Sequence, residues 1–465
     1  MKSIYLFLII SFTIIVSINK LYSQPDTVWT KTLDIAGTDF QHTTDGGYII
    51  CGYDYSPSFP NLIKTDLFGD TVWTSKVGGG KINHLRSIQQ TSDGGYILGG
   101  NDPGEHAIWI IKTDALGDTV WTKSYRTNER TDITKVIETS DGGYLVSSIL
   151  GEVYRSEWLL KTDSFGDSLW SRIFSYSQFD DCVATSVLQA SDGSYIFCGG
   201  VSTMLSIYKG WIVKLNQSGE TIWTRKYQYD NFHSFELYDV QETVDGNYLF
   251  SGTLWRYPIS NPILIKTNPN GHTLWIKNYD LGNDDYVFSH GITFNDEIIA
   301  AGYRMVGDST SLFLMRTNNA GEIKWTKTIP GIKGPIGVRV VSNENFTVLC
   351  LKSYGNSLLM NFSDNIVNVQ TRIDRNISLS PILQQNYPNP FNPTTTIEFN
   401  LPKTSNVLLK IFNILGEEVS TLVSDRLSAG SHAYEWDASN LSGGVYLYRL
   451  EAEDYFETRK MILMK

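Results

Sequence analysis

The sequence contains few side chains at the spacings that catalytic or metal centres require. It has no HExxH or GxSxG pattern and no glycine-rich phosphate loop followed by lysine. Its seven histidines do not show the spacing of metal ligands. Adjacent carboxylates, which could supply an acid and a base, occur at Asp180-Asp181, Asp284-Asp285 and Glu417-Glu418. Such pairs in loops are usually only solvated, so the sequence predicts no catalytic residue, no metal site and no cofactor. Residues from different repeats could still converge unseen.

Aromatic and charged side chains in segments of variable length are better candidates, and the chemistry they suggest is ligand binding. Aromatic faces with scattered acids and arginines suit sugar rings or a peptide segment. The candidates are Tyr53, Tyr55, Arg126, Tyr229, Trp255, Arg256, Tyr257, Asp284 and Asp285. The same rings could instead pack against neighbouring loops.

These segments lie within and between the copies of a repeat with a period near fifty residues. The clearest copy is Ser92–Gly100 followed by Ile108–Lys123. Its turn recurs, with increasing divergence, at Asp45, Asp141, Asp192, Asp245, Asn295 and Asn343. Its tryptophan recurs at Trp29, Trp73, Trp121, Trp170, Trp223, Trp275 and Trp325. Four short strands per copy at this period predict a seven-bladed β-propeller over residues 24–373, with each tryptophan filling the wedge between blades.

Two segments could supply the last outer strand, and a propeller must join its first and last blades. Asp26–Lys31 keeps Trp29, whereas Asn365–Arg372 has Asn368 in that place. We therefore expect Asp26–Lys31 to complete the blade built from Ile336–Asn361.

The two faces of such a disc should differ. The DGG and GD turns are short and uniform and lie on one face. The variable loops lie on the other face, where function tends to sit. This loop face is where we expect a ligand.

The four cysteines, Cys51, Cys182, Cys198 and Cys350, are predicted to be buried thiols rather than bonded pairs. Residues 1–23 have the charge and apolar run of a secretory signal. No later segment is apolar enough to cross a bilayer.

The repeat stops after Ile373, and residues 374–393 form a linker rich in proline and asparagine. Alternating apolar runs over residues 383–465 then predict a small, Ig-like β-sandwich. Five motifs lie here in order, YPNPFNP, LGEEV, GSHAYEWD, SGGVYLYRL and KMILMK. This region resembles the type A C-terminal sorting domain of the type IX secretion system. The resemblance implies contact with that secretion machinery, passage through the periplasm, and usually removal of the domain with attachment or release of the cargo.

The net charge of −11 argues against a nucleic-acid partner. We expect a secreted or outer-membrane surface protein whose propeller is a binding module for a glycan or a protein. The alternative is a secreted polysaccharide lyase or hydrolase with its site at the channel mouth. A structural surface protein without a small ligand is a third reading, and fold alone cannot choose among them.

Overall fold

The computed structural model describes residues 24–53, 60–78, 84–102, 106–152, 154–175, 181–202, 208–228, 233–255, 259–307, 309–353, 355–364, 381–383, 386, 389, 391–401, 404–413, 417–428, 430–452 and 455–464. The predicted signal at residues 1–23 and the alternative strand Asn365–Arg372 lie outside these residues. The chain divides into two compact units, Met1–Ile366 and Val367–Lys465.

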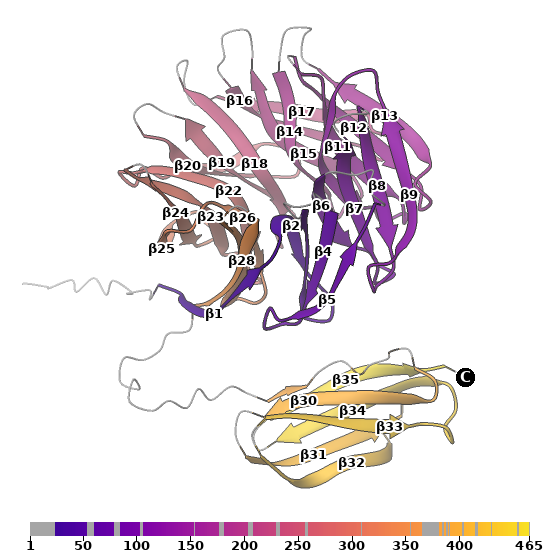
Figure 1. Ribbon diagram of the computed structural model, residues 1–465. Helices are drawn as coiled ribbons and strands as arrows, with labels where there is room; N and C mark the ends of the chain where they lie inside the picture. The colour runs from indigo at the N-terminus through magenta and orange to yellow at the C-terminus, as the bar shows by residue number, and fades with distance from the viewer. Residues whose placement is uncertain are drawn as a thin grey trace, which may run out of the picture. The chain divides into compact units, whose positions relative to one another are not determined.

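The first unit is the predicted seven-bladed propeller, built of four-stranded antiparallel sheets (Figure 1). Blade one contains β2 (Ala36–His42), β3 (Tyr48–Tyr53), β4 (Pro60–Thr65) and β5 (Thr71–Lys76). Blade two contains β6 (His84–Gln90), β7 (Tyr96–Asp102), β8 (Ala107–Thr113) and β9 (Thr119–Arg126). Blade three contains β10 (Thr131–Glu138), β11 (Tyr144–Leu150), β12 (Ser156–Thr162) and β13 (Ser168–Phe174). Blades four and five contain β14 (Asp181–Gln189), β15 (Tyr195–Ser202), β16 (Tyr208–Leu215), β17 (Thr221–Tyr227); and β18 (Ser234–Glu242), β19 (Tyr248–Trp255), β20 (Asn261–Thr267), β21 (Thr273–Asn278). Blades six and seven contain β22 (Asp284–Ile292), β23 (Ile298–Val306), β24 (Ser309–Thr317), β25 (Ile323–Pro330); and β26 (Pro335–Val340), β27 (Asn345–Ser353), β28 (Asn356–Ser363), β1 (Asp26–Leu33).

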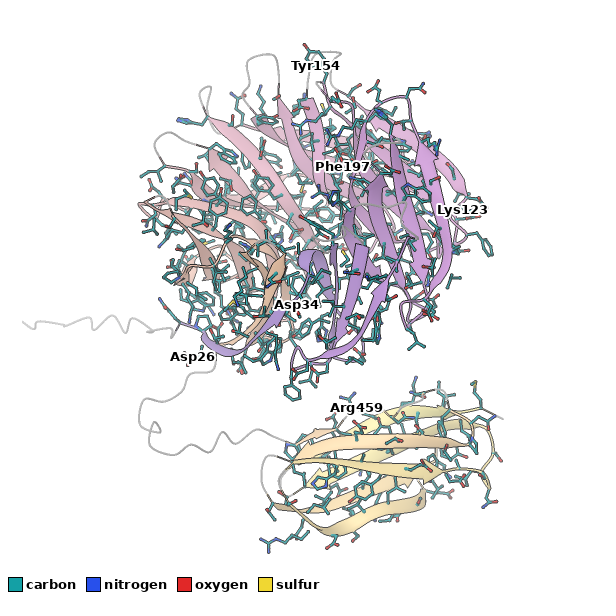
Figure 2. The ribbon with its side chains drawn as sticks, viewed as in Figure 1. Asp26, Asp34, Lys123, Tyr154, Phe197 and Arg459 are labelled. Atoms are coloured by element: carbon teal, nitrogen blue, oxygen red, sulfur yellow. The ribbon has the colours of Figure 1, made fainter. Side chains whose placement is uncertain are left out.

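The first strand of each blade lies nearest the axis. Contacts run from β2 through β6, β10, β14, β18, β22 and β26 and back to β2, which closes the ring. The fourth strands form the outer rim, where Lys123 lies in Figure 2, whereas Phe197 is fully buried in the interior. The second strands are almost wholly buried, because both of their faces pack against neighbouring blades.

The N-terminal segment closes the ring as predicted. Strand β1 pairs antiparallel with β28 of blade seven, and Trp29 lies opposite Asn361. The Trp29 ring packs edge-on against Tyr48 of blade one, with ring centroids 6.0 Å apart. Trp73, Trp121 and Trp170 repeat this contact with a tyrosine of the following blade. The tryptophans therefore fill the wedges between blades.

Glycine in the third-to-fourth turn makes this packing feasible. Gly69 has φ of +77°, and a Cβ there would lie 2.7 Å from the Trp29 ring. Both the backbone conformation and the approach of the ring therefore require glycine.

A buried lysine ties each DGG turn to the third strand of its blade. The Lys161 ammonium lies 2.8 Å from the Asp141 carboxylate, although the Lys161 side chain is only 2% exposed. The Asp141 carboxylate also accepts the Gly143 amide at 3.1 Å. Equivalent pairs in other blades are Lys64–Asp45, Lys112–Asp93, Lys214–Asp192 and Lys266–Asp245.

The four cysteines are buried free thiols, as predicted. Burial, the first of several causes, raises the pKa of Cys51 to about 12, so this thiol stays protonated and unreactive at neutral pH. Among the described residues, no helix has the length and apolarity needed to cross a membrane.

The second unit is a β-sandwich, also as predicted. One sheet has the order β29 (Ile382–Leu383), β30 (Thr394–Leu401), β33 (Gly430–Asp437). The other has the order β32 (Glu418–Leu427), β31 (Ser405–Phe412), β34 (Gly444–Ala452), β35 (Tyr455–Leu463). Residues of both sheets share one core, which includes Phe399, Leu409, Trp436 and Tyr448. Buried residues alternate with less buried ones along β31, which explains the period-two pattern of its sequence.

Candidate functional site

An ion-paired network crosses the axis of the propeller. Each first strand has a β-bulge, and the residue after the bulge faces its equivalents around the axis. Asp39 of blade one lies 3.0 Å from Lys135 of blade three and 3.1 Å from Arg339 of blade seven. It also accepts the Ile88 amide at 3.1 Å. Burial alone would raise the pKa of Asp39, but the two cations lower it below its ordinary value. Asp39 therefore stays ionised and joins blades, and it is poorly suited to donate a proton.

An aromatic cluster lies on the loop face, between blades five and six. Tyr286 and Tyr303 are cross-strand neighbours on β22 and β23, with ring centroids 4.3 Å apart. Trp255, at the end of β19, meets Tyr286 edge-on at 5.0 Å. Phe288 and Tyr238 are the bulged residues of β22 and β18, and their rings lie 5.0 Å apart. Together these five residues are called the aromatic cluster below. Trp255 is its most exposed ring, at 37%.

Two carboxylates hold the phenols of this cluster. The Tyr238 hydroxyl donates to Glu236 at 2.6 Å, and the Tyr286 hydroxyl donates to Asp284 at 3.0 Å. The other oxygen of Asp284 accepts the Ser260 amide at 2.7 Å, at the boundary between the two blades. Burial, followed by the Tyr286 and Asp284 charges, raises the pKa of Tyr303 to about 12. The cluster thus presents neutral rings and carboxylate oxygens.

Of the predicted site residues, the structure brings Trp255 and Asp284 together through Tyr286. Asp285 is fully buried and forms a two-point ion pair with Arg304, at 2.7 and 2.8 Å, so it faces the inside of blade six. Arg304 also lies 4.9 Å above the Phe313 ring. Asp285 and Arg304 therefore neutralise each other within the blade.

The remaining candidates are distributed differently. Tyr53, at the end of β3, is half-buried and packs edge-on against His84 at 5.0 Å. Arg126 is exposed at the end of β9 in blade two. Both belong to blades other than five and six. The other four, Tyr55, Tyr229, Arg256 and Tyr257, lie outside the described residues.

The sequence interpretation missed Tyr238, Tyr286, Phe288 and Tyr303 as members of one cluster. Tyr286 and Phe288 stand two residues apart, as in ordinary strand alternation, but Phe288 is itself the bulged residue of β22, and its ring also meets Tyr238 of blade five. A bulge has no distinct residue signature here, because the bulged position is Thr38, Arg86 or Tyr238 in other blades. The signal that could have identified them is a concentration of aromatics in first strands, which is confined to blades five and six.

Within the part of the chain that the structure describes, no group of three or more His, Cys, Asp or Glu residues is placed to hold a metal ion. Burial raises the pKa of the Glu157 carboxyl to about 8, and this residue is fully buried between blades three and four. It cannot reach a ligand.

Comparison with known proteins identifies the C-terminal unit. Residues 385–464 match the secretion system C-terminal sorting domain family. A search of the curated proteins gives no match. Among solved structures, a puromycin hydrolase variant has a TM-score of 0.50 at 10% identity, covering 78% of this chain and 58% of that chain. That likeness shows the fold alone.

Two further structures are similar at lower scores. A Bacteroides caccae protein of unknown function has a TM-score of 0.39 at 12% identity, covering 61% of this chain and 94% of that chain. PorZ, a surface component of the type IX secretion system of Porphyromonas gingivalis, has a TM-score of 0.26 at 9% identity, covering 93% of this chain and 82% of that chain. Fold and family match together lead to one conclusion: the chain is a β-propeller protein with a type IX sorting domain, exported through the periplasm to the cell surface or the medium.

Proposed function

We propose that this exported propeller is a carbohydrate-binding module whose site is the aromatic cluster on the loop face of blades five and six. The observation that carries the proposal is the gathering of five aromatic rings at one blade boundary, with Trp255 exposed. Aromatic faces pack against the CH faces of sugar rings, and a few placed polar groups then set orientation.

The polar groups around the cluster favour a neutral sugar. Glu236 and Asp284 supply carboxylate oxygens, each of which can accept more than one hydrogen bond. The nearby cation, Arg304, is already neutralised by Asp285. Hydroxyl groups of a neutral glycan would donate to these oxygens, whereas an acidic glycan would be repelled.

The test is a glycan array with the full chain, followed by calorimetry on any glycan that binds. Trp255→Ala and Tyr303→Ala should each weaken binding at least about tenfold, as expected for central aromatic anchors. Tyr154→Ala is the matched control, because Tyr154 is a 48% exposed tyrosine of blade three. Binding that is unaffected by Trp255→Ala and Tyr303→Ala, or preference for uronic acids over neutral sugars, would refute the proposal.

The samples of the glycan array should also be assayed for new reducing ends and for unsaturated sugar products. The alternative of a polysaccharide lyase or hydrolase predicts turnover there. The ion-paired state of Asp39 gives that alternative no support, because its carboxylate is ionised and engaged by two cations. A peptide array run in parallel covers a protein ligand, and binding there alone would contradict the carbohydrate assignment.

A further inference from the structure

The bulged residue of each first strand lies beside the axis, one residue nearer the loop face than the ion-paired network. In blades one, three and four this residue is a threonine, Thr38, Thr134 and Thr185. The Thr38 hydroxyl donates to the Leu85 carbonyl of blade two at 2.7 Å, and the Thr185 hydroxyl donates to the Leu237 carbonyl of blade five at 2.8 Å. At these positions the side chain therefore ties one blade to the next.

Three larger side chains replace threonine at this position. They are Arg86 in blade two, Tyr238 in blade five and Phe288 in blade six. Tyr238 and Phe288 belong to the aromatic cluster. Because seven blades surround the axis, blade two lies opposite the boundary between blades five and six. Arg86 therefore stands across the axis from the two rings.

Side chains of non-adjacent blades already meet one residue deeper. Lys135 of blade three lies 3.0 Å from Asp39 of blade one. In a ring of seven, blades that are three apart are only slightly more distant than blades that are two apart. An arginine and a tyrosine together are also longer than a lysine and an aspartate. One ligand can therefore contact both Arg86 and Tyr238.

The Arg86 guanidinium has its donors free for such a ligand. Arg86 is exposed, and among the described residues it forms no hydrogen bond or ion pair. The deeper cations differ, because Lys135 and Arg339 both bind Asp39, at 3.0 and 3.1 Å. Arginine carries five N–H donors and no acceptor.

The neighbours of Arg86 leave its charge without a counter-charge. His84 precedes it by two residues on β6, and the Tyr53 ring packs edge-on against His84 at 5.0 Å. Burial and then the Arg86 charge lower the pKa of His84, while Asp132 raises it. His84 is therefore neutral at neutral pH. Asp132 is itself bound to Arg130 at 3.1 Å.

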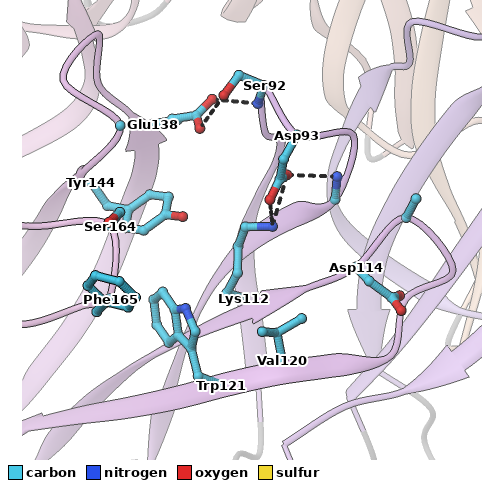
Figure 3. A pocket seen from close by; sticks show the side chains of 13 residues that line it. Ser92, Asp93, Lys112, Asp114, Val120, Trp121, Glu138, Tyr144, Ser164 and Phe165 are labelled. Carbon is cyan, nitrogen blue, oxygen red and sulfur yellow. Dashed lines mark hydrogen bonds and ion pairs between the residues drawn. The ribbon is translucent and has the colours of Figure 1, made fainter. Parts of the chain in front are cut away.

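The cavity on the turn face, by contrast, is lined by groups that bind each other. It lies between blades two and three and has a volume of about 660 Å³ (Figure 3). Its lining ammonium, Lys112, lies 2.9 Å from Asp93, and the Ser92 hydroxyl donates to Glu138 at 2.9 Å. Arg86 is therefore the better candidate for a ligand contact.

A sugar hydroxyl both donates and accepts hydrogen bonds, whereas the carboxylates Glu236 and Asp284 only accept. We propose that Arg86 supplies the missing donors, and that the ligand is a glycan chain long enough to lie across the axis from the aromatic cluster to this guanidinium. The inference rests on the carbohydrate function proposed above. It adds to it that an extended chain, and not a single terminal sugar, is bound.

The experiment is calorimetry on the full chain with the neutral glycan that binds on the array and with its shorter fragments. Arg86→Ala should weaken binding of the longest chain at least about tenfold, because it removes hydrogen bonds from a charged donor. It should leave binding of the shortest fragment that still binds unchanged. Trp255→Ala should weaken binding of both.

Arg86→Lys keeps the charge but loses the planar fork, so it should restore only part of the affinity. Arg126→Ala is the matched control, because Arg126 is an exposed arginine on the outer strand of the same blade. Its binding of every fragment should equal that of wild type.

Two outcomes separate this inference from the function on which it rests. If Trp255→Ala weakens binding but Arg86→Ala has no effect at any length, or an equal effect at every length, the extended site is wrong and the carbohydrate function stands. If no glycan binds, or if Trp255→Ala leaves binding unchanged, the carbohydrate function fails and this inference fails with it.

Discussion

The buried Lys–Asp pairs explain why the DGG turns recur, beyond the need for glycine in a tight hairpin. Each lysine is held in a nearly closed environment by an aspartate that is itself largely exposed, as for Lys161 and Asp141. Burial would raise the pKa of Asp141, but the hydrogen bond from Lys161 lowers it below its ordinary value. The pair therefore tethers a turn to a strand in each blade that carries it.

Replacing one partner of such a pair should destabilise the propeller more than replacing both partners. Asp141→Asn leaves the Lys161 ammonium buried without a counter-charge, which we expect to destabilise the propeller on the order of 3 kcal/mol. The double variant Asp141→Asn with Lys161→Met should be less destabilised, because the buried charge is gone. Thermal unfolding of the three proteins measures this, and a double variant at least as unstable as the single one would contradict the explanation.

Glu157 makes a pH-dependent contribution to stability, and its pKa is shifted in the opposite direction from that of Asp141. It is fully buried, accepts a hydrogen bond from the Ser147 hydroxyl at 2.6 Å and accepts another from the Ala184 amide at 2.9 Å. Burial raises its pKa from an ordinary 4.5 to about 8. Between these values the unfolded chain ionises while the folded chain stays protonated. Stability contributed by this carboxyl is therefore complete below pH 4.5 and is lost as the pH rises toward 8.

Glu157→Gln should abolish that loss. Relative to wild type, the variant should gain stability from pH 5 to pH 8, by an amount on the order of a few kcal/mol. Unfolding midpoints at both pH values report it, with the exposed Glu152→Gln as the control. Parallel pH profiles for wild type and Glu157→Gln would show that the carboxyl is ionised in the folded chain.

At the scale of elements, ring closure depends on β1. This strand lies last in its blade, pairs with β28, and carries Trp29 into the wedge against Tyr48 and Gly69. Removing it would expose the edge of β28 and open the boundary between blades seven and one.

Deleting residues 24–33 should therefore lower the unfolding temperature of the propeller by several degrees, and Trp29→Ala should lower it by less, because Trp29 is only half-buried. Val28→Ala is the control, since that side chain is 56% exposed on the same strand. An unchanged unfolding temperature in the deletion would mean that another segment closes the ring.

The repeat made these elements readable from the sequence. Seven turns, the recurring tryptophans and the retained Trp29 were sufficient to predict the blades and their closure, because each observation recurs and each copy checks the others. The site was less readable. The cluster of Tyr238, Tyr286, Phe288 and Tyr303 depends on bulges and on contacts between blades, and neither has a local sequence signature. Asp285 looked available in a loop, yet a partner nineteen residues away, Arg304, holds it inside the sheet.

At the scale of the whole molecule, the two units have different roles. The C-terminal unit has its own core and matches the sorting family over residues 385–464. If it is the export address, truncation after Ile373 should leave a folded propeller in the periplasm of a host with this secretion system. Fractionation and protease shaving of intact cells measure this, with the full chain as control. Surface display of the truncated chain would contradict the assignment.

The two faces of the propeller can be told apart by hydrogen exchange. Hydrogen exchange should be followed in the full chain with and without a neutral glycan that binds on the array. We expect slower exchange in β18, β22 and β23 and at the end of β19, around Tyr238, Trp255, Tyr286 and Tyr303, with the turn face unchanged. Protection confined to the turn face, around Tyr144 and Phe165, would contradict the placement of the carbohydrate site on the aromatic cluster.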